Sequence, residues 1–232
     1  MPAKRRGPGT SPAMVDRWEG GVGWIAHPDE GMRRTSHALA TDEGVWLVDP
    51  VDADGVDDLV SEYGEVAGVV VLSSYHSRDA DTFAQRYDVP VHGPSFFDGL
   101  EGSCDAPVQG FFGTLGDSEY RLLELYDDAV WSDAALWDGE TLVVMEALAT
   151  SPTQTVGDER LAVSFVRRLV PPRRALSGLH PERILVGHGE GVHADASAAL
   201  ETALATARRR APRYFLENGG YVVGALSSAV GD

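Results

Sequence analysis

The segment from Val66 to Ser73, with the sequence VAGVVVLS, constrains the fold of this chain more than any other. A continuous apolar run of this length is typical of a strand that is buried on both faces of a sheet. A second apolar run, GVWLVD at residues 44–49, precedes it, and between the two Val56, Val60 and Tyr63 recur at helical spacing. A strand, a helix and a strand in this order predict a parallel crossover with a helix packed on the sheet.

The alternation of strand and helix patterns continues along the chain. We expect strands at residues 23–27, 35–41, 89–91 and 183–187, and a hairpin at Asp138-Gly139, because this dipeptide suits the positive φ angles of a tight turn. Apolar residues at helical spacing predict helices after residue 78, at 161–169, and from about 200 to Ala211, where Pro212 cannot continue the hydrogen bonds. The result is a set of strands between helices.

One folded domain accounts for most of the 232 residues. Residues 1–13, MPAKRRGPGTSPA, are basic and rich in Pro, Gly and Ser, so they predict a disordered tail that buries little apolar surface. The folded domain is then expected at residues 14–232. Met14 directly precedes it, so the natural start is either Met1 or Met14.

The formal charge of the chain is −17, and Lys4 is its only lysine. This balance argues against a nucleic-acid partner, which requires a basic surface. Together with the presence of only two isoleucines, it resembles the composition of proteins from salt-accumulating microbes. In such proteins a negative surface keeps the molecule soluble while high salt screens its self-repulsion.

Nothing in the sequence predicts export or insertion into a membrane. The single cysteine, Cys104, allows no internal disulfide, and no apolar signal-peptide region follows the short basic start. The apolar tail at residues 221–230 is shorter than the roughly 18 residues that a spanning helix needs. We expect a cytoplasmic protein without a membrane partner, and the sequence leaves its oligomeric state open.

Three stretches resemble the metallo-β-lactamase superfamily: GVWLVDP at residue 44, VVVLSSYHSRDADTFAQRYDVPVHGP at residue 69, and WDGETLVVMEAL at residue 137 with RILVGHGEGV at residue 183. The resemblance extends over nearly the whole chain from about residue 14. It implies an α+β fold, a four-layer αββα sandwich. It also implies hydrolase chemistry at two zinc ions, which acidify a bridging water and polarise a carbonyl or phosphoryl oxygen.

The metal-binding loop of that family departs from its usual form in this chain. Where the family has Thr-His-Xaa-His-Xaa-Asp-His, the sequence reads Ser73-Ser74-Tyr75-His76-Ser77-Arg78-Asp79. His76 is the one histidine kept there. Arg78 occupies the position of the metal-binding aspartate, where a permanent cation repels a divalent ion. Asp79 replaces the last histidine, and is either a ligand or a residue favoured by the exposed N–H groups at the start of a helix.

The remaining ligand positions lie in the second half of the chain. The family's third histidine has no counterpart in residues 127–133, Glu146 stands for the bridging aspartate, and His188 keeps the last histidine. Because an unpaired carboxylate after an apolar strand is costly, Glu146 needs a metal or a cation beside it, and Arg78 is the obvious cation. His76 is a ligand, a general base or a neutral ring that hydrogen-bonds the loop.

Two functions are consistent with this pattern. The first is a divergent hydrolase of a small ester or thioester, with His76 and Asp79 as catalytic residues and at most one zinc, held by His76, Asp79, Glu146 and His188. The alternative is a non-catalytic descendant that binds a small molecule or a partner, with Arg78 as a cleft cation in place of the metal. Either way, no intact dinuclear site is expected.

The charge of the chain leads to a first testable prediction. We expect the midpoint of thermal unfolding to rise between dilute buffer and molar potassium chloride, by roughly 2–4 °C for each kcal/mol of stability gained, because salt screens the repulsion among acidic residues. Calorimetry at several salt concentrations measures this. A midpoint that does not depend on salt would contradict the salt-adaptation hypothesis.

Overall fold

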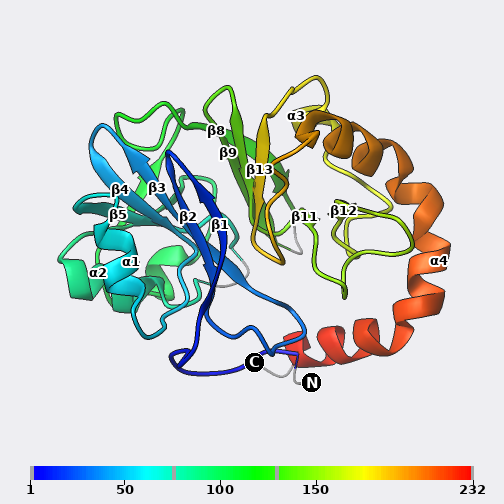
Figure 1. Ribbon diagram of the computed structural model, residues 1–232, viewed down its shortest axis with the longest axis horizontal. Coiled ribbons are helices and arrows are strands. Elements are labelled where there is room, and N and C mark those ends of the chain that lie inside the picture. Colours follow the sequence, from blue (N-terminus) through cyan, green and yellow to red (C-terminus); the bar gives the residue numbers. More distant parts are fainter. Residues whose placement is uncertain (1–2, 75–76, 129–130, 231–232) are drawn as a thin grey trace.

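The computed structural model describes residues 3–74, 77–128 and 131–230. Two β-sheets pack face to face, and helices cover the outer face of each (Figure 1). The order of layers is therefore helix, sheet, sheet, helix. This confirms the four-layer αββα sandwich that the sequence predicted.

The first sheet has seven strands in the order β1-β2-β3-β4-β5-β6-β7. Neighbours from β1 to β4 are antiparallel, and those from β4 to β7 are parallel. The strands are β1 (Ala13–Trp18), β2 (Gly21–Ile25), β3 (Thr35–Thr41), β4 (Gly44–Val48), β5 (Val66–Val70), β6 (Val91–Pro94) and β7 (Val108–Phe111), with a 3-10 helix at Leu100–Gly102.

The second sheet has four strands in the order β13-β10-β9-β8. They are β8 (Arg121–Asp127), β9 (Ser132–Trp137), β10 (Thr141–Val144) and β13 (Arg183–Val186), and a small separate pair consists of β11 (Leu148–Ala149) and β12 (Ala162–Val163). The predicted hairpin is confirmed, because β9 and β10 are antiparallel and Gly139 has a φ of 107° in the turn. By contrast β10 and β13 are parallel, so both strands end at the same edge.

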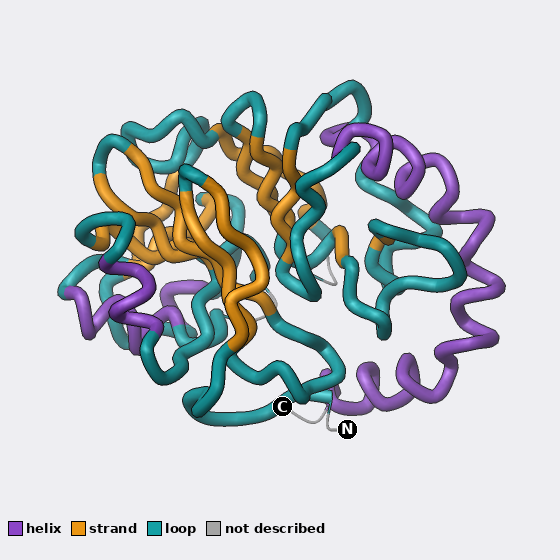
Figure 2. The backbone as a smooth tube through the Cα atoms, in the orientation of Figure 1, coloured by secondary structure: helices purple, strands orange, loops and turns teal. Residues whose placement is uncertain are grey.

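The helices cover the two outer faces (Figure 2). They are α1 (Val56–Ser61), α2 (Ala80–Tyr87), α3 (Arg173–Leu176) and α4 (Ala196–Val230). Along β4 the side chains alternate: Val45 and Leu47 pack with α1 and α2, whereas Trp46 and Val48 pack against the second sheet. This period of two explains the continuous apolar runs, because both faces of the first sheet are covered.

The prediction of a helix at residues 161–169 is wrong. Ala162 and Val163 pair with β11, and turns follow. Leu169, which would complete the apolar helical face, is 61% exposed. Phe165 instead stacks on Tyr214 of α4, with ring centroids 6.2 Å apart. The helical spacing therefore arose from residues that pack against different elements.

The end of the last helix also differs from the prediction. Pro212 lies inside α4, which continues to Val230 and curves around the second sheet (Figure 1). Tyr214 is fully buried just beyond the proline, and its hydroxyl donates to the carbonyl of Thr153 at 2.6 Å. Tertiary packing therefore outweighs the hydrogen bond that proline removes. Among the described residues no helix is long and apolar enough to cross a membrane.

The segment expected to be a disordered tail contacts the domain over its described part, residues 3–13. Gly9 pairs with the chain after β4, receiving a hydrogen bond from the N–H of Asp54 and donating one to the carbonyl of Asp52, both at 2.8 Å. The carbonyl of Gly7 lies 2.9 Å from Nε2 of His27. Amino-acid composition does not predict these contacts, because they use mainly backbone atoms.

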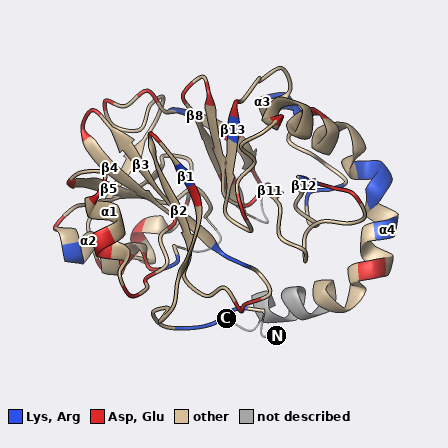
Figure 3. Ribbon diagram, in the orientation of Figure 1, with Lys and Arg blue, Asp and Glu red and all other residues tan. Residues whose placement is uncertain are grey.

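Acidic residues are spread along loops and helices of both halves of the molecule, as the red segments of Figure 3 show. The chain has 19 lysine and arginine residues against 36 acidic ones, and a group of the basic residues lies on α4. The acidic residues are thus distributed over many elements of the described chain. The salt-adaptation hypothesis stays a prediction.

Gly187 at the end of β13 provides a test of the packing between β10 and β13. A Cβ atom at this position would lie 2.2 Å from the carbonyl oxygen of Met145. We expect Gly187→Ala to lower the free energy of unfolding by roughly 1–3 kcal/mol, as overpacking does, in urea titrations. Gly102→Ala is the control, because its Cβ would meet nothing within 4 Å. Equal stability of the two variants would contradict the close approach.

Candidate functional site

The candidate site lies at the edge of the sandwich where β4, β10 and β13 end. The chain before β3 meets the chain after β13 here: the N–H of Thr35 donates to the carbonyl of Gly187 at 2.9 Å, and the N–H of Gly189 to that of Arg33 at 2.9 Å. The two sheets are therefore joined by backbone hydrogen bonds at this edge. Side chains from both sheets converge on it.

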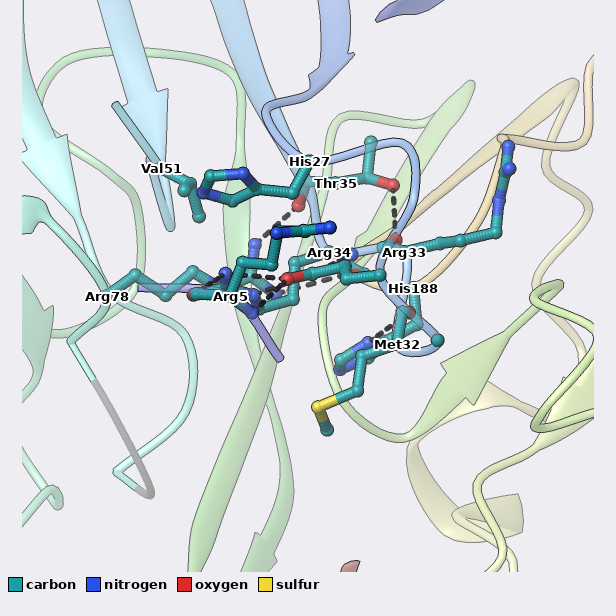
Figure 4. Close-up of polar contacts among 12 residues, drawn as sticks. Arg5, His27, Met32, Arg33, Arg34, Thr35, Val51, Arg78 and His188 are labelled. Atoms are coloured by element: carbon teal, nitrogen blue, oxygen red, sulfur yellow. Dashed lines mark hydrogen bonds and ion pairs between the residues drawn. The ribbon is translucent and has the colours of Figure 1, made fainter. Parts of the chain in front are cut away.

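Arg78 occupies the centre of this edge. Its backbone has a φ of 53°, and its side chain has no exposed surface. The guanidinium donates to the carbonyls of Thr35 at 2.6 Å, Asp49 at 3.0 Å and Gly187 at 3.1 Å (Figure 4). Burial lowers the pKa of Arg78, while the carboxylates of Asp49 and Glu146 act in the opposite direction. One cation is thus hydrogen-bonded to the ends of strands from both sheets.

Glu146 is the second residue after β10, and its Oε1 lies 4.0 Å from Nη2 of Arg78. The two side chains lie together, as the sequence predicted. The same Oε1 is 3.0 Å from Nε2 of His188, and Nδ1 of His188 is 3.0 Å from the carbonyl oxygen of Met32. Both ring nitrogens of His188 therefore lie within hydrogen-bonding distance of oxygen atoms, and the tautomer decides which of them donates.

The structure places Asp79, whereas the roles predicted for His76 are not tested. Asp79 is at the N-cap position of α2 but makes no side-chain capping hydrogen bond. Its Oδ2 accepts instead from the N–H of Asp52 at 2.8 Å, so it holds the loop after β4. His76 lies outside the described residues, so its roles as ligand or catalytic residue stay predictions. Within the described ranges, no three His, Cys, Asp or Glu side chains form a group that could hold a metal ion.

Asp133, the second residue of β9, was not singled out from the sequence. It is fully buried, and neither carboxylate oxygen has a hydrogen-bond partner in the described part of the chain. Burial, Glu146 and Asp49 together raise the pKa of Asp133 well above its usual value. An aspartate inside the buried strand SDAALW was the available sequence signal, because a buried carboxylate normally has a partner.

A buried ion pair lies next to Arg78 and was also missed. Glu30 and Arg34 are joined by two side-chain hydrogen bonds of 2.8 and 2.9 Å. The backbone N–H of Arg5 donates to Glu30 at 3.0 Å, so the N-terminal segment closes this pair. Burial acts to raise the pKa of Glu30, but the hydrogen bonds from Arg34 and Arg5 outweigh it and the pKa is lowered.

The long helix α4 brings Tyr221 toward the same region. Its ring lies edge-on to Phe165 with centroids 6.2 Å apart. Burial raises the pKa of Tyr221, and the charges of Glu146 and Glu30 add to this effect. The part of α4 beyond Pro212 therefore reaches the candidate site, which the predicted helix end at Ala211 would not have allowed.

The layers, the strand order and the position of the site define the metallo-β-lactamase fold. Similar solved structures include the DIM-1 metallo-β-lactamase, with a TM-score of 0.55, 14% identity and coverage of 85% of this chain and 97% of that one. FIM-1 from Pseudomonas aeruginosa, in a mono-zinc form, gives a TM-score of 0.57 at 10% identity over 88% and 98% of the two chains.

TTHA1623 in a di-iron-bound form has a TM-score of 0.52 and 17% identity over 72% of this chain and 93% of that one. The sequence matches no protein-family model and no curated protein. Identities this low show a shared fold, and the fold alone does not carry an activity. The chemistry has to be argued from the residues of this site.

Glu30 leads to a prediction about acid stability. We expect Glu30→Gln to cost roughly 3–5 kcal/mol at pH 7, because it leaves the buried guanidinium of Arg34 without its charge partner. Since the pKa of Glu30 is lowered by folding, its contribution is present above the unfolded pKa and is lost as pH falls through the folded one. The difference between the two proteins should therefore shrink below about pH 4.

Urea titrations of both proteins at several pH values measure this difference. Glu19→Gln is the control, because Glu19 is exposed, and a change of at most about 0.5 kcal/mol is expected for it. A difference between wild type and Glu30→Gln that stays constant with pH would contradict the assignment.

Proposed function

We propose that this protein is a metal-free member of the metallo-β-lactamase fold whose cleft binds a small molecule. The observation that carries the proposal is the buried guanidinium of Arg78, which donates to three backbone carbonyls and lies 4.0 Å from Glu146. In this interpretation the guanidinium takes the structural role that a metal ion has in hydrolases of the fold. It connects the ends of both sheets and balances the charge of a partly buried carboxylate.

The donor set of the described residues does not fit a dinuclear zinc centre. Such a centre needs about six protein ligands with free lone pairs. His188 has both nitrogens directed at other oxygen atoms, and Asp79 is bonded to the N–H of Asp52. A divalent ion about 4 Å from Arg78 would also be repelled by roughly 8 kcal/mol at an effective dielectric constant of about 20. Mutual repulsion therefore disfavours adding a metal to this arrangement.

A metal-assisted hydrolase of a small ester or thioester is the second candidate. The adjacency of Glu146 and His188 supports it, because a carboxylate and an imidazole 3.0 Å apart are the usual means of orienting a general base. As placed, however, Nδ1 of His188 faces the carbonyl of Met32 and Nε2 faces Glu146. A water would have to replace one of these two oxygen atoms before His188 could act as a base, so binding is the better supported function.

Metal content separates the two candidates. We expect the protein purified without chelator from zinc-supplemented cells to contain far less than one equivalent of zinc by elemental analysis. The variant Arg78→Asp, which removes the cation and adds a carboxylate, should acquire more zinc than the wild type. Circular dichroism checks that it is folded.

Arg174→Asp is the matched control, because Arg174 is exposed on α3 and the variant has the same change of charge. It should leave zinc content unchanged. Two equivalents of tightly held zinc in the unmodified protein would overturn the proposal. Stoichiometric zinc together with loss of both metal and esterase activity in His188→Ala would favour the hydrolase instead.

A further inference from the structure

Exposed apolar side chains gather around the middle of α4, which lies on the outer face of the second sheet (Figure 1). Two segments of the chain supply this group, which we call the α4 patch: Val166, Leu169, Val170, Phe215 and Leu216. Leu216 is 86% exposed, and Leu169 and Val170 are exposed by 61% and 62%. Single exposed apolar residues are common, whereas a contiguous group of them marks a surface that another molecule covers.

Contacts between the two segments show that the α4 patch is contiguous. Nε of Arg208 donates to the carbonyl of Leu169 at 2.8 Å, so Leu169 lies beside the first part of the patch on α4. Further along the helix, Phe165 stacks on Tyr214, which directly precedes Phe215. The loop at residues 165–170 therefore runs beside α4 over about two turns.

Exposed residues on α4 form a stripe next to this loop. Arg208, Pro212, Phe215 and Leu216 are exposed and recur every three to four residues, which places them along one side of the helix. Residues 207, 211 and 214 are buried on the side that faces the second sheet. Leu169 thus adjoins the Arg208 end of the stripe, and Leu216 lies at the opposite end.

This order of groups makes the stripe complementary to itself. Leu216 follows Arg208 by about 12 Å along the helix axis, and Pro212 lies midway between them. A two-fold axis at Pro212 would bring Leu216 of one copy onto the Arg208 end of another, where Leu169 is exposed. The same apolar contact would then form twice, as in an interface between two identical surfaces.

Charged groups fit the same antiparallel arrangement. Arg208 and Arg209 are exposed at one end of the stripe. At the other end Glu217 pairs with Arg213 of its own chain and its side chain is still 47% exposed. Antiparallel pairing brings Arg209 of one copy toward Glu217 of the other. It also keeps the two copies of Arg208 about 12 Å apart along the axis, where salt screens their repulsion.

We propose that the α4 patch is the interface of a symmetric dimer of this chain, in which the two α4 helices run antiparallel and cross near Pro212. Leu216 of one copy packs against Leu169 and Val170 of the other. The interface holds α4 on both sides of Pro212, and the part beyond it carries Tyr221 toward the candidate site. The inference goes beyond the proposed function, because it depends neither on the metal content nor on the ligand of that site.

Sedimentation velocity of the full chain at about 1 to 200 µM tests the dimer. Molar potassium chloride in the buffer suppresses association through surface charge alone. We expect the average mass to rise from monomer toward dimer with concentration. Leu216→Glu should weaken association by roughly tenfold or more, because it places a charge in an apolar contact. Phe112→Glu is the matched control, since Phe112 is 79% exposed outside the patch, and it should leave association unchanged.

A charge exchange tests which residues meet. Leu169→Arg and Leu216→Glu should each be largely monomeric at a concentration where the wild type is dimeric. An equimolar mixture of the two variants at low salt should regain the dimer. In the mixed dimer the new arginine of one chain faces the new glutamate of the other, and the second contact keeps its two leucines. Circular dichroism confirms that each variant is folded.

Wild-type protein that stays monomeric over the whole concentration range would overturn this inference. Equal weakening by Leu216→Glu and Phe112→Glu, or a mixture that does not regain the dimer, would overturn it as well. Monomeric wild type that binds phosphatidylglycerol vesicles, with loss of binding in Leu216→Glu, would show that an anionic lipid surface covers the patch instead of a second copy.

Discussion

The guanidinium of Arg78 is the contact on which the edge of this sandwich depends. It donates to carbonyls at the start of β3, after β4 and after β13, so it connects the first sheet to the second. A fully buried arginine is costly unless its donors are satisfied and its charge is balanced. Backbone carbonyls satisfy the terminal nitrogens here, and Asp49 and Glu146 supply the opposite charge.

The rest of the site follows from this arrangement. Glu146 lies between Arg78 and His188, and His188 in turn reaches the carbonyl of Met32. The buried pair of Glu30 and Arg34 lies on the other side of Arg78 and is closed by the N-terminal segment. Hydrogen bonds and charge pairs are therefore continuous across the edge. Such a network holds one geometry firmly when all its members are satisfied.

Asp133 stands out within this network. Nε of Arg78 also has no hydrogen-bond partner in the described part of the chain, but Asp133 is fully buried and neither of its two carboxyl oxygens has one. Proteins rarely retain such a group without a reason in folding or function. The charges of Glu146 and Asp49 act on Asp133, so this carboxyl group belongs to the candidate site.

The sequence by itself indicated strands covered by helices, because continuous apolar runs such as residues 66–73 require burial on both faces and helical spacing marks the covering elements. The resemblance to the metallo-β-lactamase superfamily added the order of the four layers. It also indicated the pairing of Arg78 with Glu146, since a charge after a buried strand needs a partner. It did not reveal β1, β7 or β8, whose residues are partly exposed and lack a clean period of two.

Only the tertiary structure decided the long-range details. The helix predicted at residues 161–169 was replaced by turns that pack on α4, and α4 continued past Pro212 because Tyr214 is buried against the loop that contains Thr153. Segments far apart in the chain supply the partners of His188 and the hydrogen bond from the N–H of Asp52 to Asp79. They also surround Asp133, whose carboxyl oxygens have no hydrogen-bond partner in the described part of the chain. Local pattern cannot specify such contacts, because their energies depend on which distant atoms the fold brings within hydrogen-bonding distance.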